Sequence, residues 1–213
     1  MDEQQNMRQY AESLCNDSNA LFKEMEEYAQ QQKVPIIENE SINIMLQILD
    51  VHQSKKILEI GTAIGYSALR MASALQGVHV VSLEKDQKSY EKALYFREKS
   101  NVSTQTTFLH TDALAEPPVL DTSQLYDVLF IDAAKGKYID FFERYHPYVK
   151  PNGLIISDNV FFKGWTAVPE EAPKRIRSMV QKIRYYNDWL SKHPSFKTRF
   201  LTVGDGLAVS IKK

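Results

Sequence analysis

Short, continuously apolar segments alternate with helical stretches through the middle of this chain, and this alternation constrains the fold more than any other feature. The expected strands are residues 57–60, 78–83, 107–109, 128–131 and 154–157. Continuous apolar strands suit a parallel sheet covered on both faces, and alternation with helices is typical of doubly wound α/β folds. The sequence therefore predicts an open, mostly parallel sheet with helices on both sides.

The two ends of the chain depart from this alternation. Apolar residues near helical spacing before residue 50 predict helices that pack on the core. Residues 196–203 and 206–212 are strand-like and are joined by a Gly-Asp-Gly turn signal, which predicts an antiparallel hairpin. Because no repeat, low-complexity tract or linker separates these parts, we expect residues 1–213 to form a single domain.

Composition narrows the class of protein. The single cysteine, Cys15, excludes an internal disulfide framework and fits a reducing compartment. We expect a cytoplasmic protein, because the N-terminus has no apolar signal segment and no apolar run is long enough to span a bilayer. The net charge of −1 does not by itself indicate a nucleic-acid partner, although a local basic patch would still permit one.

A glycine-containing turn follows the first expected strand. Gly61 and Gly65 lie between this strand and a helical segment, where glycines let the backbone approach a ligand closely. The start of that helix and the Ser67 hydroxyl could receive a carboxylate. Two glycines four residues apart are weak evidence alone, and a structural turn explains them about as well.

Acidic residues after the next two strands strengthen the prediction of a bound nucleoside. Glu84 ends the second strand, where a carboxylate can accept hydrogen bonds from two ribose hydroxyls. Asp112 and Ala113 follow the third strand, where an adenine ring would lie. Alone, Glu84 would be a helix-start acid and Asp112 a helix N-cap. Together with the glycine turn, these residues predict an adenosyl-cofactor site.

Polar residues follow the fourth and fifth expected strands directly. Asp132 follows the fourth, and Asp158 and Asn159 follow the fifth. Because these strand ends lie at the same end of the sheet, three oxygen ligands of the kind that Mg²⁺ prefers would converge there. Each residue alone could cap a helix or a turn, but the combination favours a metal.

The chain resembles the cation-dependent O-methyltransferases of the catechol and caffeoyl-CoA type. Four segments in this order carry the resemblance, and they are ILEIGTAIGYSALRMA, YDVLFIDAAKGKY, GLIISDNV and GDGLAVSIK. The resemblance covers roughly residue 36 to the C-terminus. It implies a seven-stranded, Rossmann-like class I methyltransferase fold with a C-terminal antiparallel hairpin, S-adenosylmethionine as methyl donor and Mg²⁺.

The resemblance also assigns roles to individual residues. The implied metal ligands are Asp132, Asp158 and Asn159. The implied cofactor contacts are the Ile37 backbone, Glu59, Gly61, Ser67, Glu84, Asp112, Ala113 and Asp132. The implied catalytic residues are Asp132 and Lys135, the lysine acting either as general base or as electrostatic stabiliser. Without the resemblance, Lys135 would be interpreted as a surface lysine.

Further stretches are similar to bacterial tRNA 5-hydroxyuridine methyltransferases, which make 5-methoxyuridine at the wobble position. They include VPIIE, DNVFFKG and KIRYYNDWLSKHP. We therefore expect the anticodon region of tRNA as substrate and, as in relatives, a homodimer. Catechol-like diols or acyl-CoA phenols are the alternative substrates, and a decayed, non-catalytic nucleotide-binding protein is a second alternative. Thr202 replaces the substrate-contacting glutamate of animal catechol enzymes, which puts a catechol-specific pocket in doubt.

Residues 173–190 predict an amphipathic helix with a basic exposed face that could track phosphates. Its basic residues are Lys174, Arg175, Arg177, Lys182 and Arg184. A solvated helix face is the alternative. The residues after the expected metal ligands could form a rim on which a flipped base stacks, or serve packing or a dimer contact. These are Phe161, Phe162, Lys163 and Trp165.

Overall fold

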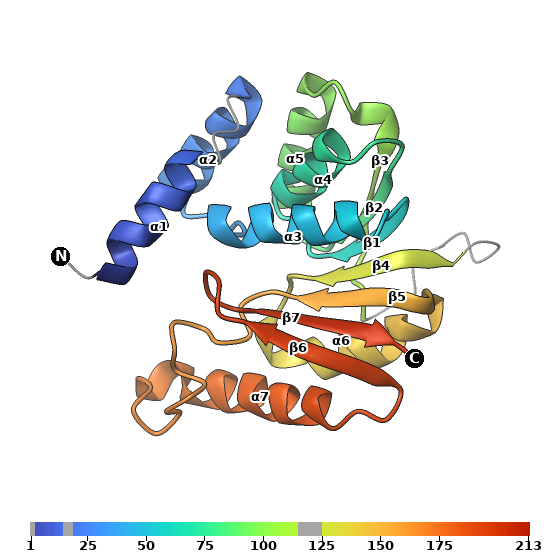
Figure 1. The fold of residues 1–213 in the computed structure, drawn as a ribbon. Helices are drawn as coiled ribbons and strands as arrows, with labels where there is room; N and C mark the ends of the chain where they lie inside the picture. Colours follow the sequence, from blue (N-terminus) through green and yellow to red (C-terminus); the bar gives the residue numbers. More distant parts are fainter. Residues whose placement is uncertain (1–2, 15–18, 115–124) are drawn as a thin grey trace.

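The computed structural model describes residues 3–14, 19–114 and 125–213 of this chain (Figure 1). At its centre is a seven-stranded sheet with the strand order β3-β2-β1-β4-β5-β7-β6. Strands β1 to β5 pair in parallel, whereas β7 runs antiparallel to both β5 and β6. The predicted α/β class, the mostly parallel sheet and the C-terminal hairpin are therefore confirmed.

The observed strands lie where the apolar segments predict them. The parallel strands are β1 (Lys56–Ile60), β2 (His79–Glu84), β3 (Thr106–His110), β4 (Tyr126–Ile131) and β5 (Val149–Ser157), and the hairpin strands are β6 (Phe196–Leu201) and β7 (Leu207–Lys212). The helices between strands are α4 (Tyr66–Ala74), α5 (Gln87–Lys99), α6 (Tyr138–Tyr145) and α7 (Lys174–Ser191). Short 3₁₀ turns are η1 (Ser103–Gln105), η2 (Lys135–Lys137) and η3 (His146–Tyr148).

Both faces of the sheet are buried, which explains why its strands are apolar throughout. On β4, Val128 and Phe130 pack with the side that carries α3, α4 and α5, whereas Leu129 and Ile131 pack with α6 and α7. Successive side chains of a strand point to opposite faces, so a strand between two helical layers needs apolar residues at every position. Figure 1 shows these two layers above and below the sheet.

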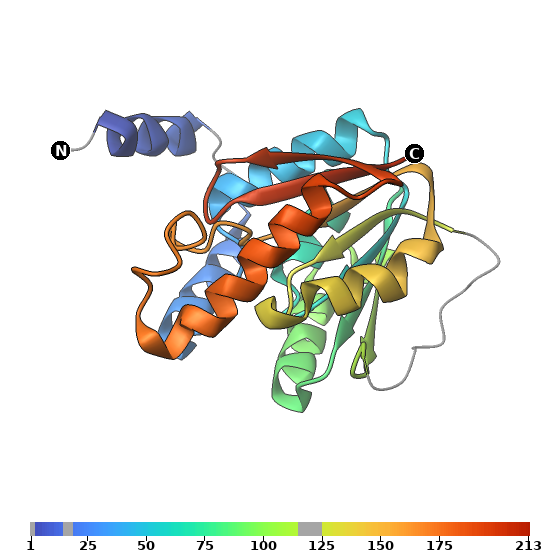
Figure 2. The same ribbon diagram turned by 90° about the horizontal axis from the view of Figure 1, so that it is seen from below.

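The N-terminal segment forms three helices, α1 (Glu3–Leu14), α2 (Ala20–Gln32) and α3 (Asn39–Val51). Helices α2 and α3 contribute buried side chains such as Met25 and Met45 to the core, as predicted. Helix α1 instead leaves apolar side chains exposed, at Met7, Tyr10 and Leu14, and lies at one side of the molecule (Figure 2). The homodimer remains a prediction, and Cys15 lies outside the described residues.

Within the described part of the chain, no helix combines the length and the apolar composition that crossing a bilayer requires.

An aromatic cluster joins α6, α7 and β6 on the face of the sheet that they cover. The ring of Phe142 is fully buried, and its centroid lies 5.0 Å from that of Trp189 and 4.8 Å from that of Phe196, both in edge-to-face geometry. Such contacts stabilise beyond the burial of apolar area. The cluster therefore fixes α7 against the sheet and, with it, the long loop that precedes α7.

Replacing Phe142 with alanine should lower the free energy of unfolding by about 3–5 kcal/mol, since it removes a buried ring and leaves a cavity. Urea denaturation followed by circular dichroism measures this difference. The matched control is Tyr185→Ala on α7, where the side chain is 65% exposed and the expected change is within about 0.5 kcal/mol. Equal effects of the two substitutions would contradict the role assigned to the cluster.

Candidate active site

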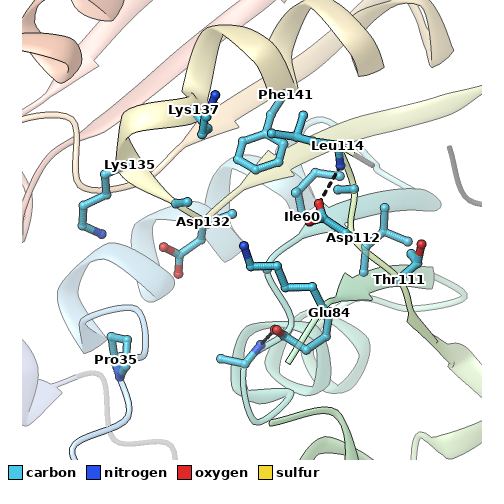
Figure 3. A pocket seen from close by; sticks show the side chains of 17 residues that line it. Pro35, Ile60, Glu84, Thr111, Asp112, Leu114, Asp132, Lys135, Lys137 and Phe141 are labelled. Atoms are coloured by element: carbon cyan, nitrogen blue, oxygen red, sulfur yellow. Dashed lines mark hydrogen bonds between the residues drawn. The ribbon is translucent and has the colours of Figure 1, made fainter. Parts of the chain in front are cut away.

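A cavity of about 390 Å³ opens at the carboxyl ends of the parallel strands, where the strand order changes direction between β1 and β4 (Figure 3). Ligands of open α/β sheets bind at such switch points. Several predicted site residues line it, namely Gly61, Glu84, Asp112, Ala113, Asp132 and Lys135. Figure 3 shows Glu84 and Asp112 on one side and Asp132 with Lys135 on the other.

Gly61 allows the turn after β1 to pass directly beneath the end of β4. Its φ is +103°, and a Cβ at this position would lie 2.0 Å from the carbonyl oxygen of Asp132. The amide of Asp132 in turn donates to the carbonyl of Ile60 over 3.0 Å. A side chain at Gly61 would therefore displace the backbone that carries Asp132, which explains the glycine physically.

Glu84 and Asp112 present carboxylates to the cavity while they hold local backbone. Glu84 accepts hydrogen bonds from the amides of Ala63 (2.7 Å) and Asp86 (2.8 Å), so it ties the turn after β1 to the end of β2. Asp112 accepts from the amide of Leu114 over 2.9 Å. Each carboxylate can hold these amides and still face the cavity, because a carboxylate oxygen has more than one acceptor site. The cap of α5 is Asp86 rather than Glu84, and Asp112 begins a turn rather than a described helix.

Glu59 and Ser67 lie behind the cavity rather than in its lining. Glu59 is fully buried, and its two carboxylate oxygens accept hydrogen bonds from the hydroxyls of Ser67 and Ser82. Burial raises the pKa of Glu59 to about 7, and the two serine hydrogen bonds lower it only in part. Ile37 is also buried in the core. Direct cofactor contacts by Glu59, Ser67 and the Ile37 backbone remain predictions.

Asp132 and Asp158 form a pair of carboxylates at the ends of β4 and β5. Asp158 is 1% exposed, and its Oδ1 accepts from the amide of Asn159 over 2.7 Å. Its Oδ2 is buried and finds no hydrogen-bond partner in the part of the chain that the structure describes. Burial and the negative charge of Asp132 raise the pKa of Asp158 well above its usual range. Burial also raises the pKa of Asp132, opposed by the charge of Lys135. A buried pair of this kind calls for a cation.

The donor set fits a hard divalent cation such as Mg²⁺. Asn159 adds an amide oxygen next to the two carboxylates, and at present this oxygen accepts a hydrogen bond from Lys135 Nζ. Oxygen ligands with one or two carboxylates are what Mg²⁺ prefers. No group of three or more His, Cys, Asp or Glu side chains suited to a metal occurs among the described residues, so the third protein ligand would have to be Asn159.

Asp205 and Gly206 hold the loop that follows Asn159, a role that sequence reasoning missed. The Asp205 carbonyl accepts from the amide of Phe161 over 2.8 Å, and its Oδ1 accepts from the amide of Lys163 over 3.0 Å. A Cβ at Gly206 would lie 2.3 Å from the Phe161 ring. The Gly-Asp-Gly signal was interpreted only as a hairpin turn, because its partner loop is distant in sequence.

The rim predicted after the metal ligands is only partly exposed. Phe161, Phe162 and Trp165 are half-buried, and Lys163 is exposed. Lys135 Nζ lies 5.8 Å from the centroid of the Phe162 ring. Phe162 is thus near the predicted reaction centre, while Phe161 packs between Gly206 and Phe200. The structure supports the packing alternative for Phe161.

Two of the five predicted basic residues of α7 bind carbonyl groups of the loop that precedes the helix. Arg177 is half-buried and donates through Nε and Nη2 to the carbonyl of Ala172, while Arg184 Nη1 donates to the carbonyls of Thr166 and Ala167. Arg177 therefore departs from the expected exposed face, whereas Arg184 stays exposed, and the role of this face in binding tRNA stays a prediction. Both arginines bind the loop because its turns leave carbonyl groups that need donors. The ones that remain exposed without such a contact are Lys174, Arg175 and Lys182.

Comparison with known proteins adds to this geometry. A family model described as O-methyltransferase matches residues 12–213. The chain belongs to the O-methyltransferase family. It is 30% identical over 185 residues to a caffeoyl-CoA O-methyltransferase of Populus kitakamiensis, covering 83% of this chain and 76% of that protein. It is 32% identical over 187 residues to that of Petroselinum crispum, covering 81% and 73%.

Solved structures of O-methyltransferases share the fold. A crystal structure from Staphylococcus aureus, provisionally named a caffeoyl-CoA O-methyltransferase, matches with a TM-score of 0.89 and 35% identity over 96% of this chain and 98% of that one. An O-methyltransferase from Bacillus cereus in complex with SAH matches with a TM-score of 0.81 and 24% identity, over 96% of each chain. The second likeness concerns the fold alone.

Replacing Glu59 with glutamine should change how stability depends on pH. Burial raises the pKa of Glu59 from its ordinary value of 4.5 to about 7 in the folded state, so the contribution of Glu59 to the free energy of unfolding falls as pH rises through this window. The fall is on the order of 3 kcal/mol. The variant lacks it, so its stability relative to wild type should rise between pH 4.5 and 7.

Urea denaturation at a series of pH values measures this difference, with Glu98→Gln on the exposed surface as the matched control. A difference between wild type and Glu59→Gln that is constant across pH would contradict the assignment of a raised pKa to Glu59.

Proposed function

We propose that this family member is an S-adenosylmethionine- and Mg²⁺-dependent O-methyltransferase that methylates 5-hydroxyuridine at the tRNA wobble position to 5-methoxyuridine. The observation that carries the proposal is a carboxylate pair: Asp132 is half-buried in the lining of a cavity of about 390 Å³, and the buried Asp158 has an Oδ2 with no hydrogen-bond partner among the described residues. A cation would satisfy this oxygen and a nucleoside would fit the cavity.

The cavity supports S-adenosylmethionine as the methyl donor. Its volume lies in the range of small-molecule sites, about 300–1,000 Å³. Glu84 is available to ribose hydroxyls, and Asp112 with Ala113 borders the neighbouring part of the cavity. The bound SAH in the Bacillus cereus relative, the demethylated form of the same donor, supports this choice.

Mg²⁺ bound by Asp132, Asp158 and Asn159 would lower the pKa of the substrate hydroxyl and neutralise the oxyanion that attacks the methyl group. The protein itself provides position and charge. Lys135 Nζ is held at the Asn159 amide, where its ammonium would stabilise the developing oxyanion. As a free amine it would instead accept the hydroxyl proton. Gly61 and the end of β4 would hold the methyl donor next to the substrate hydroxyl. This proximity would raise the rate of methyl transfer.

The tRNA substrate is supported by the resemblance to tRNA 5-hydroxyuridine methyltransferases and by exposed cations near the site. Lys174, Arg175 and Lys182 are exposed on α7. The neighbouring 5-hydroxyl and 4-carbonyl oxygens of 5-hydroxyuridine also offer two adjacent oxygen ligands to a cation, as a catechol does.

Methylation of small diols or acyl-CoA phenols is the second candidate, and the named caffeoyl-CoA relatives favour it. The exposed Thr202, at the position of the catechol-enzyme glutamate, speaks against a catechol-specific pocket.

The substrate assignment is tested by incubating the protein with S-adenosylmethionine, Mg²⁺ and tRNA from cells that lack 5-methoxyuridine. Nucleosides are then quantified by mass spectrometry, with a simple catechol in a parallel reaction. We expect conversion of 5-hydroxyuridine to 5-methoxyuridine that a chelator abolishes. Methylated catechol with unchanged tRNA would instead identify small molecules as the substrates. If neither tRNA nor catechol is methylated, the result would count against both proposed substrate classes.

Asp158→Ala should reduce turnover by at least about a hundredfold, since the loss of a metal-binding carboxylate removes several kcal/mol of charge stabilisation. Binding of S-adenosylmethionine, measured by calorimetry, should change little, because Asp158 is not in the lining of the donor cavity. The matched control is Asp127→Ala at the opposite end of β4, where the carboxylate bonds to backbone amides and Lys150. Turnover that persists in Asp158→Ala under chelator would refute the metal role.

A further inference from the structure

A second cavity, of about 410 Å³, lies on the other side of η2 from the first. One side of it is formed by η2 and the start of α6, and the other by α7. The two cavities share Lys135 and Lys137 in their linings, so the second adjoins the predicted reaction centre.

Positive charge predominates in the lining of the second cavity. It contains Lys135, Lys137 and Lys182 against the single carboxylate of Asp140. The ammonium of Lys137 lies 3.1 Å from Asp140, but both side chains are about half exposed, and such surface pairs are weak. The cavity therefore has a net positive charge that an anion would satisfy.

Among the three lysines of this lining, Lys135 bonds to Asn159 and Lys137 pairs with Asp140, whereas Lys182 has no such partner among the described residues. A Cβ at Gly136 would lie 3.4 Å from its Cδ and 3.8 Å from its Nζ, so the side chain extends from α7 across to η2, next to Lys135. Within residues 3–14, 19–114 and 125–213, no hydrogen bond or ion pair involves its ammonium. Arg177 and Arg184 on the same helix are bound to loop carbonyls and serve the fold instead.

Tyr185 adds an aromatic surface to the lining. Its side chain is 65% exposed, one turn of α7 beyond Lys182, whereas the adjacent Tyr186 is buried and hydrogen-bonded to Ser157. An exposed ring beside cations is the combination with which proteins bind single-stranded nucleic acids, since bases stack on the ring and phosphates meet the cations.

We propose that the second cavity is a phosphate subsite, which holds the backbone phosphate next to the methyl-accepting nucleotide and stacks the neighbouring base on Tyr185. The inference rests on the proposed function, because it requires a polynucleotide whose target base occupies the first cavity. Lys182 is its main anion ligand, with Lys137 as the second. The phosphates of a coenzyme A thioester offer the same chemistry, and the experiment separates the two sources.

The test compares Lys182→Met with Lys192→Met, which removes an exposed charge at the end of the same helix, outside the cavity. The substrates are a stem–loop RNA that carries one 5-hydroxyuridine, the free nucleoside and caffeoyl-CoA. We expect Lys182→Met to lower the ratio of kcat/KM for RNA to that for nucleoside about tenfold and to reduce the salt slope of RNA binding by about 1. Lys192→Met should keep the wild-type ratio.

Tyr185→Ala should lower the same ratio roughly tenfold, and Tyr185→Phe should restore it, because stacking needs the ring and not the hydroxyl. Equal ratios for Lys182→Met and Lys192→Met would overturn the subsite. A loss confined to caffeoyl-CoA would overturn its assignment to nucleic acid.

Failure of the proposed function has a different signature, namely that wild type methylates no RNA. Binding of the same RNA, followed by fluorescence anisotropy with S-adenosylhomocysteine present, then decides the subsite separately. Binding about tenfold weaker in Lys182→Met than in Lys192→Met would support it, and equal affinities would overturn it.

Discussion

The pairing of a half-buried carboxylate, Asp132, with a buried one, Asp158, organises the site. Parallel pairing of β4 with β5 brings Asp132 and Asp158 to the same edge of the sheet, and their burial makes the charged forms costly. The positive charge of Lys135 offsets part of this cost, and its Nζ donates a hydrogen bond to the amide oxygen of Asn159. The layers on both faces of the sheet then keep this edge fixed. The carboxylate pair thus links the fold to the chemistry proposed for it.

Much of this fold could be predicted, because its strands are apolar throughout. A strand between two helical layers needs apolar residues on both faces, so β4 and β5 are recognisable without knowledge of their neighbours. Polar residues at the ends of such strands stand out for the same reason, which is how Asp132 and Asp158 were found. Glu84 and Asp112 followed from the same rule. The strands and the place of Asp132, Glu84 and Asp112 around one cavity were therefore predictable, because each local pattern reflects one physical cause, whereas the roles of these residues stay predictions.

Contacts between distant segments could not be predicted in this way. Direct contact of Glu59 with the cofactor stays a prediction, but its hydrogen bonds from Ser67 and Ser82 could not be predicted, because they depend on how β1, β2 and α4 come together. Arg177 and Arg184 have the same charge as Lys182, yet only the folded loop shows that their guanidinium groups serve backbone carbonyls. Asp205 is a turn residue by sequence, yet it supports a loop that lies more than forty residues away along the chain. Such roles depend on which carbonyls and amides remain unpaired after folding.

The close approach of Gly61 to the Asp132 backbone has a thermodynamic consequence. The turn that would contact the methyl donor and the residue that would bind the cation touch through main-chain atoms, so neither can shift alone. Whatever orders one of them also orders the other. Binding free energies coupled in this manner are reciprocal, and each ligand changes the affinity for the other by the same factor. Donor and cation would thus act as mutual effectors, with a single glycine as the element that couples them.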